Sequence, residues 1–231
     1  MIPPRSGPDR VADRAADRAI DRAIDRAIDR IATPHGTVVL VELGPEDVAI
    51  AAALEALPAP ERELAGRLSP ARRREFVTGR TALHAALGDP DAPILPDDRG
   101  APVLPAGWVG SISHKGALAA ALVAPAGAGW VGVDVERAAP PRVDIARRVL
   151  TPREQACVPD RGRAVTLRFS IKEAIYKAID PYLRRYVAFT EVELDLDGEA
   201  CAVTHQLPLA IEAAWREHAG HWLATARAQA R

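Results

Sequence analysis

Short apolar runs bounded by glycine or proline predict most of the strands in this chain. They are rich in β-branched residues, or they alternate apolar and polar side chains, which is typical of strands packed in sheets. The pattern places sheets in both halves of the chain and a meander in its C-terminal third. The runs occupy residues 37–43, 109–116, 117–124, 130–136, 191–196, 201–204, 209–214 and 222–226.

Helical spacing of apolar residues fills the intervals between these strands. A long helix is expected to begin after Ser69 as its N-cap and to end at Gly88. A second long helix is expected over 164–179, ending at Asp180 because the residue before Pro181 resists helical geometry. Shorter helices are expected within 45–60, where the pattern is clearest over 51–57, and at 61–68, 144–150 and 152–157.

Residues 1–32 form a low-complexity extension in which Asp-Arg recurs every four residues. This period drifts by about 40° per repeat against a helical turn, so no lasting apolar face forms. We expect a disordered or frayed helical segment, with a partner-binding helix as the alternative. The remaining chain divides into an N-terminal half, 33–125, and a C-terminal half, 126–231.

Composition excludes several classes of protein. The chain has 231 residues and a formal net charge of -1, so it can bury a core and has no overall field for nucleic acid. No apolar run is long enough to cross a membrane, and the N-terminus lacks the apolar segment of a signal peptide. Cys157 and Cys201 have neither metal-ligand spacing nor a disulfide framework. We therefore expect a cytoplasmic protein with reduced thiols.

Lysine is rare here, since only three of the 30 basic residues are lysine. Lysine supplies a compact charge that can lose its proton, a role that arginine does not fill. Two of the three, Lys172 and Lys177, fall in the segment 169–177, where a helix would place Glu173 and Lys177 on one face. Lys172 would lie roughly 100° away, so Lys177 is the candidate for chemistry. A capping box from Ser170 to Glu173 is the alternative interpretation.

Two acids end the apolar strand 130–136. Asp134 and Glu136 are two residues apart, so both side chains point to one side of the strand. Carboxylates that converge there need a cation, and Mg²⁺ prefers oxygen ligands. The alternative is a strand end that opens into solvent with Arg137 as partner.

Further polar residues suit phosphate groups. Arg72 and Arg80 are eight apart and lie toward one side of their helix, where guanidinium groups can bind phosphate by forked hydrogen bonds. Ser113 and His114 stand at a junction between two strands, beside Lys115, and offer a hydroxyl, an imidazole and backbone amides. A solvated helix face and a polar turn are the respective alternatives.

Three short motifs, in this order along the chain, resemble those of the 4′-phosphopantetheinyl transferase superfamily. They are Ser113-His114, Gly132-Val-Asp-Val-Glu136, and Lys172-Glu173 with Lys177. The segment from Arg72 to Arg80 resembles the enterobactin-type branch, which activates large synthases. The resemblance covers about residues 60–195, and residues 1–32 have no counterpart in it.

The resemblance implies an α+β fold of two pseudo-symmetric halves. Each half would be a small, mainly antiparallel sheet packed on a long helix, with the active site between them. The activity implied is transfer of the 4′-phosphopantetheine arm of coenzyme A to a serine of an apo carrier protein, with release of adenosine 3′,5′-bisphosphate. Fatty-acid, polyketide and nonribosomal-peptide carriers all fit. Because one chain holds both halves, we expect a monomer.

The resemblance also implies roles for individual residues. Mg²⁺ would be held by Asp134, Glu136 and Glu173, and Glu173 would be the base, directly or through water. Lys177 would neutralise the pyrophosphate and assist the leaving group, and His114 would complete the catalytic group. Ala101 stands where some relatives have a basic residue, and nearby Arg99 is expected to reach that phosphate. The coenzyme's phosphates would be bound by Arg72, Arg80, Arg99, Ser113, His114 and Lys177.

Two other classes of function compete with the transferase. A Mg²⁺-dependent nuclease or phosphohydrolase could use the acid pair and a lysine, but it needs a basic groove with interleaved aromatic residues. Aromatic residues make up only 4% of this chain. A non-catalytic carrier-binding module would keep the fold, but the intact acids and Lys177 argue against it.

Overall fold

The computed structural model describes residues 28–44, 47–158, 162–198 and 200–231. The predictions for residues 1–27, most of the Asp-Arg extension, lie outside these ranges. Within the described ranges, no helix combines the length and the apolar character needed to cross a membrane.

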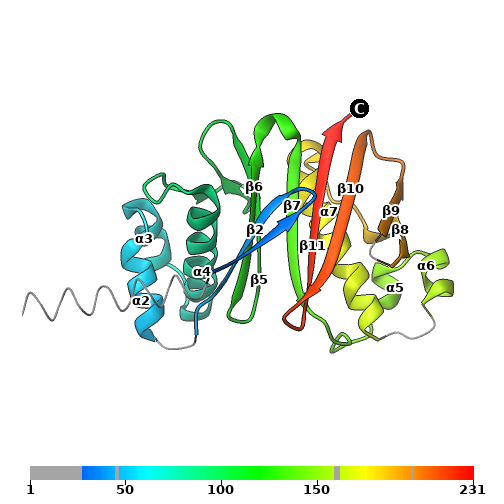
Figure 1. The fold of residues 1–231 in the computed structure, drawn as a ribbon, viewed down its shortest axis with the longest axis horizontal. Coiled ribbons are helices and arrows are strands. Elements are labelled where there is room, and N and C mark those ends of the chain that lie inside the picture. Colours follow the sequence, from blue (N-terminus) through cyan, green and yellow to red (C-terminus); the bar gives the residue numbers. More distant parts are fainter. Residues whose placement is uncertain (1–27, 45–46, 159–161, 199) are drawn as a thin grey trace, which may run out of the picture.

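The first half of the chain forms a four-stranded sheet with helices on one face. The strand order is β1-β2-β6-β5, and all neighbouring strands are antiparallel. Figure 1 shows α2, α3 and α4 together on the outer side of this sheet. The elements are β1 (Ile28–Thr33), β2 (Gly36–Glu42), α2 (Asp47–Ala56), α3 (Ala59–Gly66), α4 (Pro70–Leu87), β3 (Leu95–Pro96), β4 (Pro102–Val103), β5 (Trp108–Lys115) and β6 (Leu118–Pro125).

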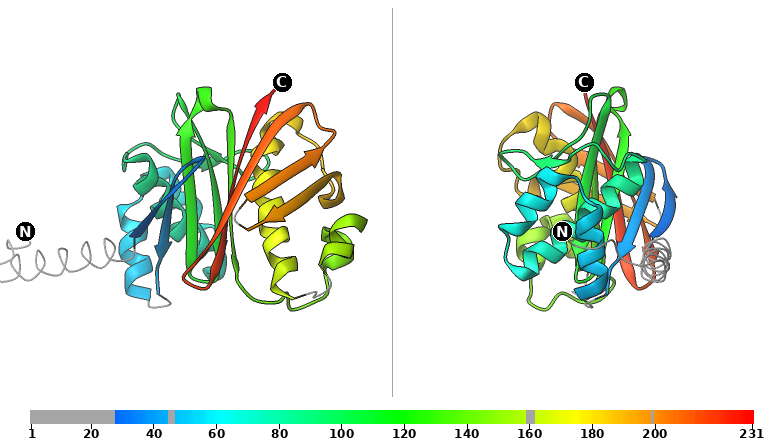
Figure 2. Two further views of the ribbon diagram at one scale, coloured as in Figure 1. Left: turned by 45° about the vertical axis from the view of Figure 1, so that its right-hand side comes forward. Right: turned by 90° about the vertical axis from the view of Figure 1, so that its left-hand side faces the viewer.

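The second half forms a three-stranded antiparallel sheet, β10-β11-β7, with α7 on one face. A separate hairpin of β8 and β9 also packs on α7 (Figure 2). The elements are η1 (Ala126–Ala128), β7 (Trp130–Arg137), α5 (Ala146–Val149), α6 (Pro152–Cys157), α7 (Arg163–Leu183), η2 (Phe189–Glu191), β8 (Val192–Asp197), β9 (Ala200–His205), β10 (Leu209–His218) and β11 (His221–Ala230).

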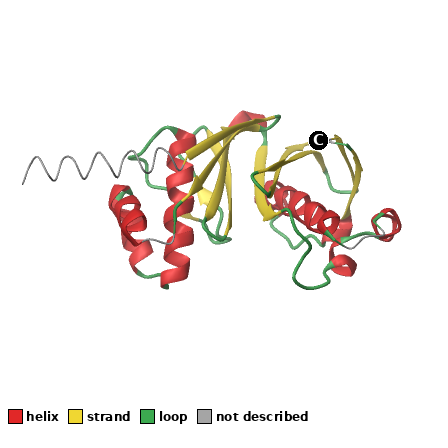
Figure 3. Cartoon of the chain, turned by 60° about the horizontal axis from the view of Figure 1, so that its bottom comes forward, coloured by secondary structure: helices red, strands yellow, loops and turns green. Residues whose placement is uncertain are grey.

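The alternation of side chains in β2 and β6 explains how the halves are stacked. Val39 and Val41 belong to the core beneath α4, whereas Val38 and Leu40 belong to a second core that the two sheets share. A third core lies between the second sheet and α7. Figure 3 shows α4 and α7 on opposite sides of the strands. The predicted α+β architecture, an antiparallel sheet on a long helix in each half, is confirmed.

The prediction that the extension reaches residue 32 is wrong for its last residues. Residues 28–33 form β1, which pairs along its length with β2. The repeat breaks at Ile31, which is buried between the sheets. A turn at Pro34 and His35, followed by Gly36 at a φ of 135°, folds β1 back onto β2. Pairing across this turn therefore outweighs the local helical tendency of the repeat.

The predicted end of the second long helix at Asp180 is also wrong. Helix α7 continues to Leu183 and contains Pro181 in its last turn. Proline has no amide hydrogen, so it cannot donate to the carbonyl four residues earlier. Pro181 lies in the last turn of the helix, so the loss of this one hydrogen bond does not interrupt the turns before it. The amide of Arg184 donates to the carbonyl oxygen of Asp180 at 2.9 Å and closes the helix, with Arg184 at a φ of 48°.

A buried acid fixes the chain after the long helix of the first half. Oε1 of Glu61 accepts hydrogen bonds from the amide of Ile94 at 2.6 Å and from Nε2 of His84 at 3.0 Å. Nδ1 of His84 lies 2.8 Å from the carbonyl oxygen of Asp89, so both ring nitrogens face acceptors. Burial alone would lower the pKa of His84, but the hydrogen bonds to Glu61 and to the Asp89 carbonyl outweigh it and raise the pKa. We infer a charged imidazolium at this position.

The second half repeats this arrangement with Glu154. Its Oε1 accepts from the amide of Leu194 at 3.0 Å, and its Oε2 accepts from Nζ of Lys172 at 2.6 Å. Glu154 also forms the capping box with Thr151 at the start of α6. Lys172 is buried and donates a second hydrogen bond, 2.8 Å long, to the carbonyl oxygen of Val149. Lys172 is therefore a structural cation, which accounts for this lysine without a role in catalysis.

Helix α7 approaches β7 most closely at Gly132. A Cβ atom added there would lie 1.9 Å from the carbonyl oxygen of Ala174 and 2.8 Å from the amide nitrogen of Ala178. Both contacts are with helix backbone, so no rotamer change can relieve them. Only glycine allows this spacing, which brings the polar face of α7 onto the strand that carries the two acids.

Substitution of Gly132 tests this packing. We expect Gly132→Ala to push α7 away from β7 and to lower the free energy of unfolding by about 3 kcal/mol, the upper end of the range for overpacked cores. Gly66→Ala is the matched control, because an added Cβ there meets nothing within 4 Å. Urea denaturation followed by circular dichroism measures both. Equal stability of the two variants would contradict the contact.

The pH dependence of unfolding tests the His84 pair. Since folding raises the pKa of His84, the stabilisation is fully present below about pH 6.5 and is lost as pH rises through the folded pKa. We expect the free energy of unfolding to fall with pH in that window, by at most about 1.4 kcal/mol per pH unit from this group. Urea denaturation of wild type and His84→Gln over pH 5.5 to about 9 measures the slope. A slope that persists unchanged in His84→Gln would remove the assignment.

Candidate functional site

Strands β5 and β7 lie side by side where the two halves meet, although they belong to different sheets. Residues with higher numbers in β5 contact residues with higher numbers in β7, so the two strands run in the same direction. Ser111 Oγ accepts from the amide of Val133 at 3.1 Å, and Ser113 Oγ donates to Oδ1 of Asp134 at 2.8 Å. Alternate residues of β5 thus line a polar seam against β7.

The side-chain alternation of β7 directs its acids toward α7. Val131, Val133 and Val135 pack into the core shared by the sheets. The alternate residues of the strand are Gly132, Asp134 and Glu136, and they must therefore face the other side. The predicted pairing of the two acids on one side of a strand follows from this alternation, and α7 covers that side.

Asp134 is a buried carboxylate with donors from two elements. It is 5% exposed. Oδ1 accepts from Ser113 and, at 2.8 Å, from Nζ of Lys177, while Oδ2 accepts from Ser170 Oγ at 2.8 Å. Lys177 also donates to the carbonyl oxygen of Val133 at 3.0 Å. A charge buried this deeply is tolerated only with such pairing, so Ser113, Ser170 and Lys177 fix the position of Asp134.

Glu136 has a different cation. Nζ of Lys115, the last residue of β5, lies 2.5 Å from Oε2 of Glu136. The Lys115 side chain is 40% exposed and the Glu136 side chain 16%. Each acid of β7 is therefore neutralised by its own lysine, Asp134 by Lys177 and Glu136 by Lys115.

Glu173 lies half-buried on α7, one turn before Lys177. Burial raises the pKa of Glu173, and the charges of Asp134 and then Glu136 raise it further. Lys177 and Arg148 act in the opposite direction and lower it. The net shift is upward, so Glu173 holds a proton more readily than an exposed glutamate and is suited to proton transfer.

Ser170 is a site residue for which the sequence pattern indicates only a possible helix cap. Helix α7 begins at Arg163, so Ser170 and Glu173 stand within the helix, and the capping-box alternative is wrong. Ser170 is completely buried and uses its hydroxyl for Asp134. The spacing of Ser170, Glu173 and Lys177, three and then four residues apart, is the helical signal that could have identified it.

Ser113 and His114 point to opposite sides of β5. Ser113 faces Asp134, whereas Nε2 of His114 lies 3.7 Å from Oε2 of Glu75 on α4. The same oxygen of Glu75 accepts from Nη1 of Arg72 at 2.8 Å. The structure therefore brings His114 and Arg72 together through Glu75, and it separates both from Ser113.

Arg80 is engaged within the first half. It is 4% exposed, its Nε donates to the carbonyl oxygen of Ile94 at 2.7 Å, and its guanidinium stacks on the ring of Phe76 at 4.5 Å. Burial lowers the pKa of Arg80. Together with Glu61, which binds the amide of the same residue, Arg80 clamps the Ile94 peptide in place.

Two ion pairs join the halves at the C-terminal end of α7. Arg99 donates to both oxygens of Asp180, with Nε 2.6 Å from Oδ2. Arg184 donates from Nη2 to Oδ2 of Asp98 at 2.7 Å. Arg99 is thus held by α7, and the phosphate contact predicted for it from the sequence would require it to share or exchange Asp180.

The acids have the ligand chemistry of Mg²⁺, but they are not assembled as a finished metal centre. Among the residues that the structure describes, no three or more His, Cys, Asp or Glu side chains are grouped so as to hold a metal ion. Hydroxyl and ammonium groups occupy both oxygens of Asp134, and Lys115 is paired with Glu136. The mutual repulsion that raises the pKa of Glu173 shows that the three carboxylates act on one another. This all-oxygen set fits Mg²⁺ once the lysine contacts yield.

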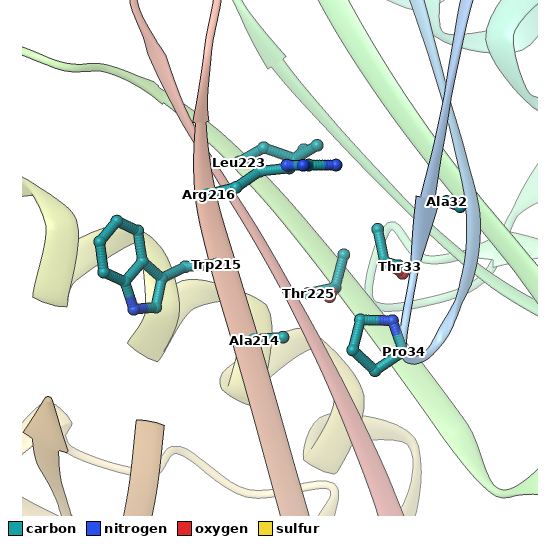
Figure 4. Close-up of a pocket in the computed structure, with 8 residues that line it drawn as sticks. All are labelled: Ala32, Thr33, Pro34, Ala214, Trp215, Arg216, Leu223 and Thr225. Carbon is teal, nitrogen blue, oxygen red and sulfur yellow. The ribbon is translucent and has the colours of Figure 1, made fainter. Parts of the chain in front are cut away.

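A separate pocket of about 260 Å³ lies between the β1–β2 turn and the β10–β11 hairpin. Figure 4 shows Thr33, Pro34 and Thr225 facing one another across it, with Trp215 directed to the other side of β10. Arg216 is the one charged residue among the side chains that line this pocket, and the lining contains no carboxylate. This pocket therefore lacks the groups that acid–base or metal chemistry requires.

Two family models match consecutive parts of the chain. One, described as "4'-phosphopantetheinyl transferase N-terminal domain", matches residues 60–124, and the other, "4'-phosphopantetheinyl transferase superfamily", matches residues 130–228. The chain belongs to the 4′-phosphopantetheinyl transferase superfamily. The family predicted from the three motifs is thus confirmed.

Several individual proteins are similar to this chain. The 4′-phosphopantetheinyl transferase PptT of Mycobacterium tuberculosis is 33% identical over 156 residues, which are 64% of this chain and 69% of PptT. The 4′-phosphopantetheinyl transferase Svp of Streptomyces mobaraensis is 37% identical over 151 residues, and the match spans 61% of each chain. A solved structure, the holo-[acyl-carrier-protein] synthase of Thermotoga maritima, aligns at 24% identity and a TM-score of 0.35 over 44% of this chain and 64% of that one.

Titration of Glu173 tests the electrostatic arrangement of the site. Burial raises its pKa first, Asp134 adds to the increase, and Lys177 opposes it. Asp134→Asn should therefore lower the pKa of Glu173, and Lys177→Met should raise it further. Carbon-13 NMR of labelled glutamate side chains measures the titration, with the Glu173→Gln spectrum for assignment. If neither variant moves the resonance, the three groups do not act on one another as described.

Proposed function

We propose that this protein is a Mg²⁺-dependent transferase that moves the 4′-phosphopantetheine arm of coenzyme A to a serine of an apo carrier protein. The observation that supports this most directly is the cluster of Asp134, Glu136 and Glu173 facing Lys177. The cluster lies within the residues that match the superfamily. Phosphoryl transfer requires positioning and charge neutralisation above all, and this cluster provides both.

The reaction consists of one displacement at phosphorus. The serine oxygen forms a bond to the pantetheine-bearing phosphorus, the bond from that phosphorus to the bridging oxygen breaks, and adenosine 3′,5′-bisphosphate leaves. Glu173 accepts the proton of the serine hydroxyl, directly or through water, a role that suits its raised pKa. Lys177 neutralises the negative charge that grows on the leaving phosphate.

Asp134, Glu136 and Glu173 are the residues that would hold Mg²⁺. The ion, when bound, supplies Lewis-acid neutralisation of the pyrophosphate oxygens. Ser113 and Ser170 keep Asp134 oriented through their hydroxyl groups. On this proposal Ser113 supports the metal ligand, in addition to its expected role beside the coenzyme's phosphates.

The first half would bind the coenzyme's other phosphate groups. His114 and Arg72 share Glu75 and are both exposed, so a phosphate can compete for them. Arg99 stands at the junction of the halves with Asp180 as its partner. Arg80 supports the first half by holding the Ile94 peptide, and a direct contact of Arg80 with a phosphate of the coenzyme belongs to the same proposal.

We further propose that the carriers are domains of polyketide, nonribosomal-peptide or fatty-acid synthases. Enterobactin synthase component D of Escherichia coli O157:H7, which is 36% identical over 115 residues, carries the name of a siderophore system. The aligned part is 46% of this chain and 54% of that relative. We also propose a cytoplasmic monomer, since both halves of the site come from one chain.

A transfer assay tests the proposed function. The protein is incubated with coenzyme A, Mg²⁺ and a panel of apo carriers of all three kinds, and each carrier is weighed by mass spectrometry. We expect one phosphopantetheine added, dependence on Mg²⁺, and no reaction when the carrier's acceptor serine is alanine. Absence of a mass gain on every carrier would contradict the transferase. Carrier-independent release of adenosine 3′,5′-bisphosphate would instead favour a phosphohydrolase.

Substitution of Asp134 tests the acid cluster. We expect Asp134→Ala to reduce the transfer rate by about a hundredfold or more, because a charge that positions the reacting groups is lost. Asp195→Ala is the matched control, since that carboxylate is on β8 and pairs with exposed Arg153. Circular dichroism should show that both variants are folded. Transfer at the wild-type rate by folded Asp134→Ala would remove Asp134 from the site.

A further inference from the structure

All three lysines of this chain bind a carboxylate, but they do so in different ways. Lys172 is buried against Glu154, and Lys177 has two acceptors, Asp134 and the carbonyl oxygen of Val133. Lys115 differs because its side chain is 40% exposed and its ammonium has one acceptor, Glu136, among the contacts of the described residues. Because Lys115 contacts Glu136, a candidate metal ligand, its ion pair bears on metal binding as well as on stability.

Lys115 is placed so that its side chain can leave. It is the last residue of β5, and the following Gly116 has a φ of 65° in the exposed turn to β6. The ammonium side of this ion pair is open to solvent, which screens the attraction, so a divalent cation can displace Lys115 from Glu136. The backbone of Glu136 stays in place during this exchange, because Glu136 is paired with Trp222 of β11.

The formal charges of the cluster support such an exchange. Asp134, Glu136 and Glu173 carry three negative charges when ionised, and Lys177 cancels one of them. The two negative charges that remain match the charge of a divalent cation. While Lys115 stays on Glu136, only one negative charge remains, and a divalent ion would leave the site with an excess positive charge.

We infer that Lys115 is a built-in competitor of the metal ion at Glu136. In the metal-free chain its ammonium neutralises Glu136, and a divalent cation must displace it in order to bind. Lys115 therefore weakens metal affinity, and it keeps the acid pair neutralised when no metal is present. The inference rests on the proposed metal site of Asp134, Glu136 and Glu173.

Binding of Mn²⁺, followed by electron paramagnetic resonance of the free ion, tests this inference. Wild type, Lys115→Met and Lys115→Arg are titrated in the presence and absence of coenzyme A. We expect Lys115→Met to bind Mn²⁺ about tenfold more tightly, an order-of-magnitude value for removing one cation beside a ligand. Lys115→Arg keeps the competing charge and should remain within about threefold of wild type.

Arg153→Met is the matched control for loss of a positive charge, because Arg153 pairs with Glu193 and Asp195 outside the cluster. Its Mn²⁺ affinity should equal that of wild type. Thermal unfolding in EDTA checks that Lys115→Met is folded, and the increase in its melting temperature on adding Mn²⁺ should exceed that of wild type.

The outcomes separate the inference from the proposed function. If every protein binds Mn²⁺ and Lys115→Met binds no more tightly than wild type, Lys115 does not compete, and the metal site stands. Weaker binding by Lys115→Met would mean that the lysine holds Glu136 in place for the metal, which overturns the competition. If no protein binds Mn²⁺, even with coenzyme A, the metal site fails and the inference fails with it.

Discussion

The structure depends on the pairing of one buried carboxylate. Asp134 can remain ionised inside the molecule only if hydroxyl and ammonium groups replace the water it has lost. Those groups come from β5 and α7, through Ser113, Ser170 and Lys177. The Ser113 contact joins the first half to the second beside the apolar core that the two sheets share, and the contacts of Ser170 and Lys177 hold α7 on β7.

Strand β7 serves the core and the site at the same time. Its three valines fill the layer between the sheets, and the residues between them meet α7. Gly132 allows the helix backbone to approach, and the next two residues on that side are the acids. This division explains how a strand that is apolar along most of its length can end in carboxylates that face α7 and not the core.

Local pattern predicted the parts of the site that lie on one element. A period of two placed Asp134 and Glu136 on one side of a strand, and helical spacing placed Glu173 beside Lys177. It did not reveal the partners of Lys115 and Lys172 or the burial of Arg80, because each depends on an element distant in sequence. Strand β1 was missed for the same reason, since its pairing with β2 overrides a helical repeat.

The repeated buried acid gives the two halves unequal chemistry. Glu61 is matched with an imidazole, and Glu154 with an ammonium group. Hydrogen bonds to Glu61 and to the Asp89 carbonyl raise the pKa of the imidazole above its ordinary 6.5, whereas burial lowers the pKa of the ammonium below its ordinary 10.5. Each cation faces two acceptors, but a neutral His84 ring has one donor to offer them, whereas a neutral Lys172 amine still has two. Two halves of similar architecture thus differ in what the loss of one proton does, because it removes a hydrogen bond in the half that bears Arg72 and His114 and none in the other.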